Sequence, residues 1–488
     1  MQRIEIKEKT VSKALFQFIF PFSIKSETET DMVTFMQKQG FNRFRLDQLE
    51  DEQKYYGRFS VSHRDMEAYY LPFTNKVLFP HTESQKGFQR YSKKVEIHAS
   101  LKTERVEIPF VIHSLDMIIC PYQLGFLTIR TEIRDEGMPL SHAIEFAARF
   151  RVLEPRTTRD HKTVVEYGGN KFSQVENFLF DSLYPGLPEF FERESMKGAY
   201  FETFPFFEDE RMYVQSLISL KESEILEEVD VFRAGDLNGL NKEGKAYVNS
   251  NNMEYIQRYL KQNGYDRWAP NTYYLLDEHS FACISNENRD VLNQLASQIY
   301  GEFYYGLILN LFHKIVLLKM ANDYSEIEVE RDSDKIEELI HSINSFTANF
   351  FFLELATQSH GREIFVHLRK IFQIDALYED ARQTLNSLYK YKEQISSKQN
   401  SILLLILTLY TVVSGIFGMN QVIEDLKGKI KWEKLLHYNL FEYFALFTTF
   451  TGLITTVLLG TLSLIKWYRD RQKRKKWSSL TVLDPGKK

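Results

Sequence analysis

Two uncharged stretches near the C-terminal end constrain this chain more than any other feature. The first runs from Ser401 to Phe417 and the second from Tyr443 to Ile465, and they are 17 and 23 residues long. A helix needs about 20 apolar residues to cross the hydrocarbon core of a bilayer. Two buried core helices of a soluble domain would pass the same length test, so the flanking residues have to decide.

The flanks favour membrane spans. The second stretch is followed by Lys466-Trp-Tyr-Arg469, and residues 466–476 contain seven Lys and Arg. Interfacial aromatic residues followed by clustered basic residues mark the cytoplasmic side of a span. We therefore predict a multi-pass protein of the cell (inner) membrane, with both termini cytoplasmic and with the connector 421–439 outside.

The first stretch has one face of small and polar residues. Two spans cannot enclose an aqueous path, so conduction would require several copies with one helix of each around a shared axis. At 100° per residue, residues of this kind fall within about one third of the helix circumference: Asn400, Thr408, Thr411, Ser414, Gly415 and Gly418. Such a stripe is typical of a pore lining and equally of close helix packing, and the spacing alone leaves both open.

The first 285 residues predict an α+β domain. Residues 95–99 and 127–134 alternate between apolar or small and polar positions, which indicates strands. The expected elements between and after them are a turn at 121–125, a helix from Ser141, one strand within 272–285 and a break near 236–244. Beyond residue 286 the pattern is helical.

The helical part is expected to begin with two antiparallel helices, over 288–322 and 334–355. A single helix of about 57 residues, about 85 Å long at 1.5 Å per residue, then runs from Gly361 to Phe417. We accordingly divide the chain into a cytoplasmic sensing domain (1–285), a helical region with a stalk helix (286–400), a two-helix transmembrane hairpin (401–467) and a basic cytoplasmic tail (468–488).

Charge and cysteine content restrict the cellular compartment and the kinds of site that we expect. The formal net charge of −5 combines +7 in residues 466–488 with −12 in the rest of the chain. Cys120 and Cys283 are the only cysteines, too few for a disulfide framework or a cysteine-rich metal site. We expect a reducing compartment and no direct binding of nucleic acid.

The end of the first uncharged stretch carries a motif. Gly418-Met419-Asn420 follows it directly, with a long helix before it and a second span and a basic tail after it. Over residues 361–475 this arrangement resembles the CorA family of divalent-cation channels. The resemblance implies a homopentameric funnel that binds or conducts Mg²⁺, with the first span lining the pore.

The resemblance also implies roles for single residues. Asn420 would ring the outer mouth as the metal-facing group, because magnesium loses its water reluctantly and neutral oxygens can hold a hydrated ion loosely. Gly418 would let the helix end there. The implied pore and selectivity positions are Thr408, Thr411, Gly415, Gly418, Met419 and Asn420, on the face found by helical spacing, and that agreement favours a pore over packing.

Some positions depart from the family. Asn400 stands at the cytoplasmic entrance of the pore, where the family has a bulky apolar constriction, and Leu409 replaces a proline common in the middle of the span. The outer connector has four lysines beside Glu424 and Asp425. Selectivity for magnesium is therefore an open point of the resemblance.

A basic cluster in the sensing domain is the candidate site for an anionic ligand. It consists of Arg149, Arg151, Arg156 and Arg159, with His161 and Lys162 close behind. Arginines can bind phosphate through two parallel hydrogen bonds, whereas a charge run is often only a solvated loop. CorA-like proteins associated with type III CRISPR systems also have enlarged N-terminal domains, and that resemblance implies a nucleotide-type messenger as the ligand.

Three functions follow from these patterns. We expect a CorA-like pentameric channel for divalent cations, principally Mg²⁺, with an enlarged regulatory domain. The alternatives are a nucleotide-gated membrane effector of antiviral defence and a non-conducting, membrane-anchored signalling scaffold. We do not expect an enzyme, because the sequence contains no HExxH pairing and no GxxxxGK[ST] loop.

Overall fold

The structure is a computed structural model. It describes residues 4–468 except 83, 84, 86, 136, 156–159, 193–210, 328–331, 425–436, 445, 448, 449, 453, 455, 456, 459, 460, 462–464, 466 and 467; of residues 413, 414, 416–424 and 333 it describes the backbone alone. By contacts the chain divides into two units. The first comprises residues up to Glu326 and Asn344–Ala381, and the second comprises Ile327–Ile343 and the residues from Arg382 to Leu480.

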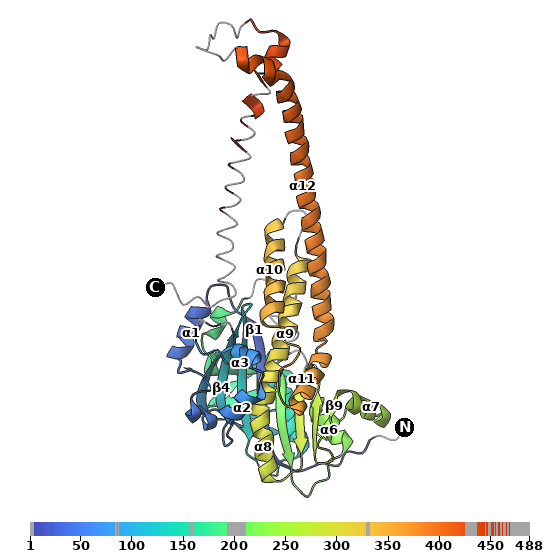
Figure 1. The fold of residues 1–488 in the computed structure, drawn as a ribbon. Helices are drawn as coiled ribbons and strands as arrows, with labels where there is room; N and C mark the ends of the chain where they lie inside the picture. The colour runs from blue at the N-terminus through green and yellow to red at the C-terminus, as the bar shows by residue number, and fades with distance from the viewer. Residues whose placement is uncertain are drawn as a thin grey trace. The chain divides into compact units, whose positions relative to one another are not determined.

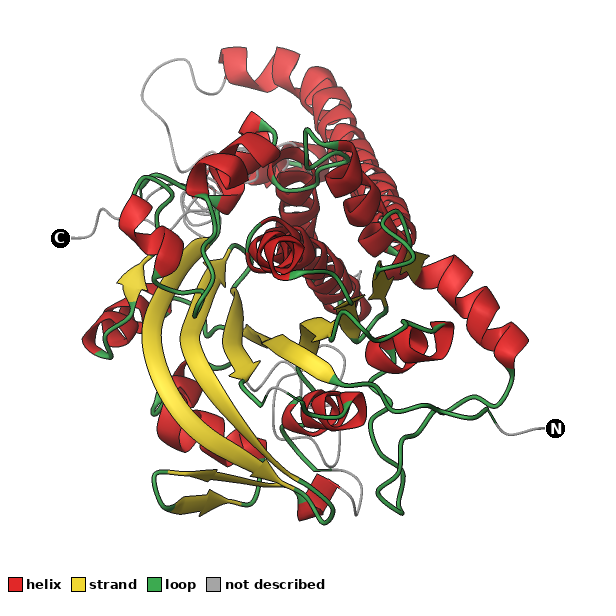
Figure 2. Cartoon of the chain, turned by 90° about the horizontal axis from the view of Figure 1, so that it is seen from below, coloured by secondary structure: helices red, strands yellow, loops and turns green. Residues whose placement is uncertain are grey.

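The first unit is built on one sheet of eleven strands (Figures 1 and 2). Its order is β7-β6-β3-β4-β5-β1-β8-β11-β10-β9, with β2 paired to β3. Every pairing is antiparallel except that of β8 with β11. The strands are β1 (Val11–Ser23), β2 (Asn42–Arg43), β3 (Gln89–Lys102), β4 (Glu107–Cys120), β5 (Leu124–Ile133), β6 (Val164–Tyr167), β7 (Asn170–Phe172), β8 (Tyr213–Leu220), β9 (Gly264–Tyr265), β10 (Thr272–Leu276) and β11 (Ser280–Ser285).

Helices flank this sheet on both faces, and loops connect the elements (Figure 2). The α-helices are α1 (Glu29–Lys38), α2 (His63–Tyr69), α3 (Pro72–Leu78), α4 (Leu140–Phe150), α5 (Val175–Asn177), α6 (Glu228–Gly235), α7 (Met253–Asn263), α8 (Arg289–Tyr300), α9 (Glu302–Ser325), α10 (Ser333–Asn349), α11 (Ser359–Ile371) and α12 (Ile374–Glu424). Shorter helical turns are η1 (Leu49–Gln53), η2 (Asp160–Lys162), η3 (Phe178–Leu183) and η4 (Leu187–Phe190).

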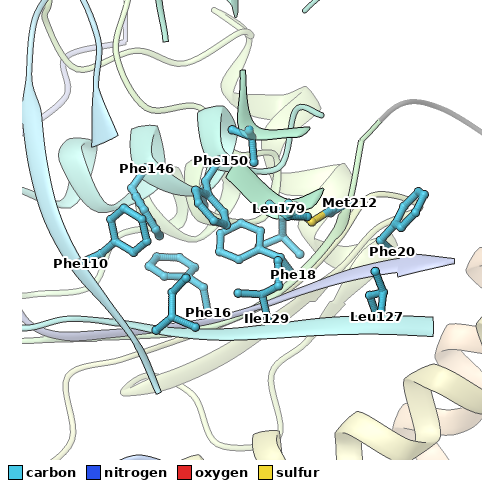
Figure 3. Packing of buried hydrophobic residues seen from close by; sticks show 14 of the residues in the cluster. Phe16, Phe18, Phe20, Phe110, Leu127, Ile129, Phe146, Phe150, Leu179 and Met212 are labelled. Carbon is cyan, nitrogen blue, oxygen red and sulfur yellow. The ribbon is translucent and has the colours of Figure 1, made fainter. Parts of the chain in front are cut away.

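One face of the sheet carries the apolar core (Figure 3). Phe16 and Phe18 of β1 project from it and pack against Phe146 and Phe150 of α4, with ring centroids 5.4 Å and 4.7 Å apart for the pairs Phe16–Phe146 and Phe18–Phe150. Burying one such ring stabilises the fold by about 1.5–3 kcal/mol. This packing holds α4, whose C-terminal end carries the predicted basic cluster.

The other face of the sheet is covered by α8 and α9, and several of the contacts there are polar. Thr128 of β5 and Tyr304 of α9 share a hydrogen bond of 2.8 Å, and the Arg90 guanidinium donates to the Tyr305 hydroxyl at 2.8 Å. Further along α9, Phe312 packs edge-on against Phe88. Both faces of the sheet are therefore buried.

Several sequence predictions are confirmed. The domain is α+β and a long helical region follows it. The alternating residues lie in β3 and β5, and the helix from Ser141 is α4. The predicted turn joins β4 to β5, with Tyr122 and Gln123 at positive φ values of 64° and 57°.

Other predictions in the sheet domain are wrong. The single strand within 272–285 is the hairpin β10–β11, because the chain reverses between Leu276 and Ser280. The strands β1 and β8 were not predicted. No domain break lies at 236–244, since β8 before it and β9 to β11 after it belong to the same sheet.

The predicted helix boundaries also need correction. The helix expected over 288–322 is divided at Gly301 into α8 and α9. The stalk helix does not start at Gly361 as one piece, because α11 ends at Ile371 and Gln373 has a φ of 53° before α12 begins. Helix α12 continues through residues 418–420 to Glu424, so the helix does not end at Gly418.

Hydropathy points to one long helical stretch in the described residues that could cross a membrane by length and composition, Arg289–Ser325. It comprises α8 and α9, and 83% of its most apolar window is buried inside the fold. Burial inside the fold therefore accounts for its apolar character.

Candidate functional site

Arg149 and Arg151 lie at the C-terminal end of α4, on the wall of a cleft of about 980 Å³ in the first unit. The lining comes from parts of the chain far apart in sequence: Thr103–Arg105, the end of α4, Asp160 and Lys162, Arg211 and the segment 236–242. Six basic residues and four carboxylates line it, which gives a net charge of +2. The lining therefore carries a small excess of positive charge.

Arg149 is held inside the protein by two carboxylates. Its Nε donates to Glu145 Oε1 at 2.9 Å and its Nη1 to Asp160 Oδ1 at 2.7 Å. Both carboxylates are almost fully buried. Because the guanidinium already has these partners, Arg149 positions Asp160 and the wall of the cleft more than it offers a charge to a ligand.

Arg151 and Arg211 are brought together by backbone pairing. Val152 and Arg211 form an isolated β-bridge, and the Met212 amide donates to the Arg151 carbonyl at 2.8 Å. Arg151 is 8% exposed. The sequence separation of 60 residues between the two arginines explains why no local pattern could predict their proximity.

The segment 236–242 also lines the cleft and is fixed on α4. The Leu240 amide donates to Glu145 Oε2 at 2.9 Å. A Cβ on Gly239 would lie 2.6 Å from the Glu145 backbone nitrogen, so only glycine fits this approach. Burial raises the pKa of Asp236, which nevertheless accepts a hydrogen bond of 2.7 Å from Asn238.

Three basic residues of the cleft were missed by sequence reasoning: Arg105, Arg211 and Lys242. Arg105 donates to the Lys242 carbonyl at 3.1 Å, and Lys162 pairs with Glu104 at 2.5 Å at the exposed rim. Isolated basic residues in separate loops give no sequence signal. The predicted ligands Arg156 and Arg159 lie outside the described residues.

The predicted pore positions lie on α12 in the second unit. The hydroxyls of Thr408 and Thr411 each donate to the carbonyl four residues earlier at 2.7 Å. Since the proton points back into the helix, each exposed oxygen presents lone pairs outward. Gly415 and Asn400 are also exposed.

The motif at 418–420 is helical, and the side chains of Met419 and Asn420 lie outside the described residues. The roles predicted for Gly418, Met419 and Asn420 therefore remain predictions.

Around the same part of α12, large apolar side chains are uncovered. Leu404, Leu405 and Leu409 are 63%, 68% and 63% exposed. The following apolar segment lies close to it at Gly452, where a Cβ would meet the Tyr410 ring at 3.4 Å. A helix that is apolar on most of its circumference needs lipid or other protein around it.

Within the described residues, no group of three or more His, Cys, Asp or Glu side chains is arranged to hold a metal ion. No protein-family model matches the chain, and no curated protein matches it significantly.

Proposed function

We propose that copies of this chain assemble in the cell membrane around a shared pore, and that the pore conducts divalent cations such as Mg²⁺ under the control of the sheet domain. The observation that carries this proposal is the surface of α12 between residues 401 and 415. It combines exposed leucine and isoleucine side chains with a stripe of Thr408, Thr411 and Gly415. Lipid would cover the leucine and isoleucine side chains, and the stripe would face an aqueous path.

The threonine oxygens fit a hydrated cation. Their protons are used within the helix, so what they offer to the pore is acceptor oxygen without charge. Neutral oxygens can replace outer-sphere water without binding the ion so tightly that it cannot leave. The resemblance to CorA channels adds the expectation of five copies, with Asn420 at the outer mouth.

Purified protein in proteoliposomes tests the proposal. We expect Mg²⁺ influx in the wild type and its loss or severe reduction in Asn420→Ala, with the assembly unchanged near five times 57.7 kDa. Gln421→Ala is the matched control, since it removes an amide about 100° away on the same helix. A monomeric or dimeric wild type would exclude a pore made of one helix per copy. Undiminished flux in Asn420→Ala would exclude a ring of Asn420 side chains as the ion site.

A second candidate, a channel opened by an anionic nucleotide-type ligand, is favoured by the basic cleft. Its lining has a net charge of +2 and comes from several separate segments, so a ligand could change their spacing. Gating would require the ligand to bind the open and closed states with different affinities. Such a channel would act as an effector that breaches the membrane when its messenger is present.

The cleft can be tested without disturbing Arg149. We expect Arg105→Gln with Arg211→Gln to weaken binding of ATP or inorganic triphosphate at least tenfold, because each lost charged hydrogen bond costs roughly 1.5–3 kcal/mol. Arg258→Gln, an exposed arginine on α7 outside the cleft, is the control. The ligand-gated channel would be excluded if flux responded to neither compound and the double variant bound both as the wild type does. A transporter without ligand gating would then remain.

A further inference from the structure

The polar face of the sheet beneath α8 and α9 holds a buried cluster with an unbalanced charge. Arg90 on β3 and Arg130 on β5 are 3% and 0% exposed, and both bind Asp116 on β4, which is 0% exposed. They share a single oxygen of that carboxylate, Oδ2. Two guanidinium groups therefore face one carboxylate.

Neighbouring titratable groups do not compensate the excess positive charge of the two arginines. Glu132 is paired with Arg134 at 3.1 Å, and Arg134 also lies 3.5 Å from Glu96, whose side chain is 66% exposed and therefore screened by solvent. Burial and the nearby Arg130 lower the pKa of His113 to about 3, so the imidazole is uncharged. Burial raises the pKa of Tyr300 and of Tyr304, which keeps both phenols neutral. The cluster thus carries one net positive charge away from solvent.

The same cluster has buried donors without a partner in the described part of the chain. They are Arg130 Nη2, the hydroxyls of Tyr56 and Tyr300, and Gln215 Nε2. All four residues are 0% exposed. The tyrosines stand around Arg130, whose guanidinium carbon lies 5.7 Å from the Tyr56 ring centroid and 5.8 Å from that of Tyr300.

Hydrogen bonds to neighbouring side chains hold two of these donor residues, Arg130 and Gln215, in fixed orientations. Arg130 Nε donates to Gln17 Oε1 at 2.7 Å, and Gln17 in turn donates to Gln215 Oε1 at 2.8 Å and to the Ile299 carbonyl at 2.9 Å. The unpartnered groups of Arg130 and Gln215 are thus the remaining ends of a fixed network. Leaving each of them unsatisfied is energetically unfavourable, because a buried donor without an acceptor keeps its full desolvation penalty.

We propose that this cluster is the binding site of one small monovalent inorganic anion, such as chloride, held between β5, α8 and the segment containing Tyr56. Water could satisfy hydrogen bonds there, but it would leave a buried net charge, which is costly. An anion supplies acceptors for the unpartnered donors and neutralises the second arginine. Asp116 is bound by Arg130 Nη1, so an anion on the free Nη2 would have to lie on the side of the guanidinium away from this carboxylate. The proposal is independent of what the membrane part conducts.

Halide titration of the full-length protein tests it. The protein is purified in detergent, exchanged into potassium gluconate and titrated with chloride or bromide at constant ionic strength, while thermal unfolding is monitored. We expect a saturable rise of the unfolding temperature. Tyr56→Phe with Tyr300→Phe should raise the half-saturating halide concentration about tenfold, and Arg130→Met should abolish the halide dependence.

Matched variants localise the effect. Tyr247→Phe with Tyr255→Phe changes two tyrosines that are each 39% exposed and should leave the titration unchanged, as should Lys162→Gln in the basic cleft. If Arg130→Met does not fold, the double phenylalanine variant decides. A wild type without saturable halide stabilisation, or a double variant with the wild-type titration, would mean that water alone fills the cluster and would overturn the proposal.

Discussion

Helices α9 and α12 are both apolar over long stretches, and they differ in what covers them. In α9, residues such as Leu307 and Leu309 are 0% exposed because the sheet and its own unit enclose them. In α12, Leu405 and Leu407 are 68% and 57% exposed. The apolar content of α9 is explained by burial within its own unit, whereas the apolar side chains of α12 are uncovered.

This difference shows why hydropathy alone is a poor guide here. The stretch that a length and composition test selects among the described residues is the buried one. A buried core helix and a membrane span have the same composition, and only the exposure of the side chains separates them. Substitutions that should act differently on α9 and α12 test this difference in burial.

The largest effect is expected in α9. Leu309→Asp places a carboxylate at a position with 0% exposure and should destabilise the sheet unit by more than about 4 kcal/mol, because a buried charge without a partner is severely unfavourable. Thermal unfolding and yield of folded protein measure it. A stable Leu309→Asp protein would show that α9 does not form the core of this unit.

The equivalent change in α12 should leave the fold intact. Leu405→Asp alters a side chain that is already 68% exposed, so the unfolding temperature of the sheet unit should not change. If lipid covers this surface, membrane insertion should become less favourable by about 2.5–3.5 kcal/mol, measured as the fraction of protein in washed membranes. Wild-type partition into membranes would argue against a span at this position.

A smaller effect separates the two sides of α12. Thr408→Val with Thr411→Val keeps the shape of the side chains but removes both oxygens, and we expect Mg²⁺ flux in proteoliposomes to fall about five- to tenfold. Ile402→Val with Ile406→Val is the control on the opposite side of the helix. Equal losses in both variants would indicate helix packing instead of a pore lining.

The smallest effect concerns the start of α9. Burial and the nearby Asp65 raise the pKa of Glu302 to about 7, above its value in the unfolded chain. A raised carboxyl pKa means that the folded protein binds the proton more tightly, so stability is highest below about pH 4.5 and decreases as pH rises through 7. Glu302→Gln should therefore stabilise the protein by about 1–2 kcal/mol at pH 8 and hardly at all at pH 4.5. Equal stabilisation by Glu302→Gln at both pH values would contradict the raised pKa as its cause.

Local patterns predicted some of the fold correctly. The turn between β4 and β5, the helix from Ser141 and the strands with alternating residues depend on neighbours in sequence, and the structure has them all. The stalk helix was predicted too long at its start, because nothing in the residues around Gln373 signals its left-handed conformation.

The candidate cleft was predicted in part. Arg149 and Arg151 were identified from a run of basic residues, and they do line a cleft. That Arg149 is already bound by Glu145 and Asp160 could not be read from the run. Its neighbour Arg211 comes from a strand edge far along the chain, and such proximity depends on the order of the strands.

By itself, the sequence determined the α+β class, the long helical region and the alternation of residues along β5, because these follow from the period of apolar residues along one segment. Only the tertiary structure decided what each face meets. The alternation in β5 would suit a sheet with one solvated face, yet Arg130 and Thr128 on its polar side are fully buried beneath α8 and α9. Burial is a property of contacts between segments distant in sequence, and no local pattern contains it.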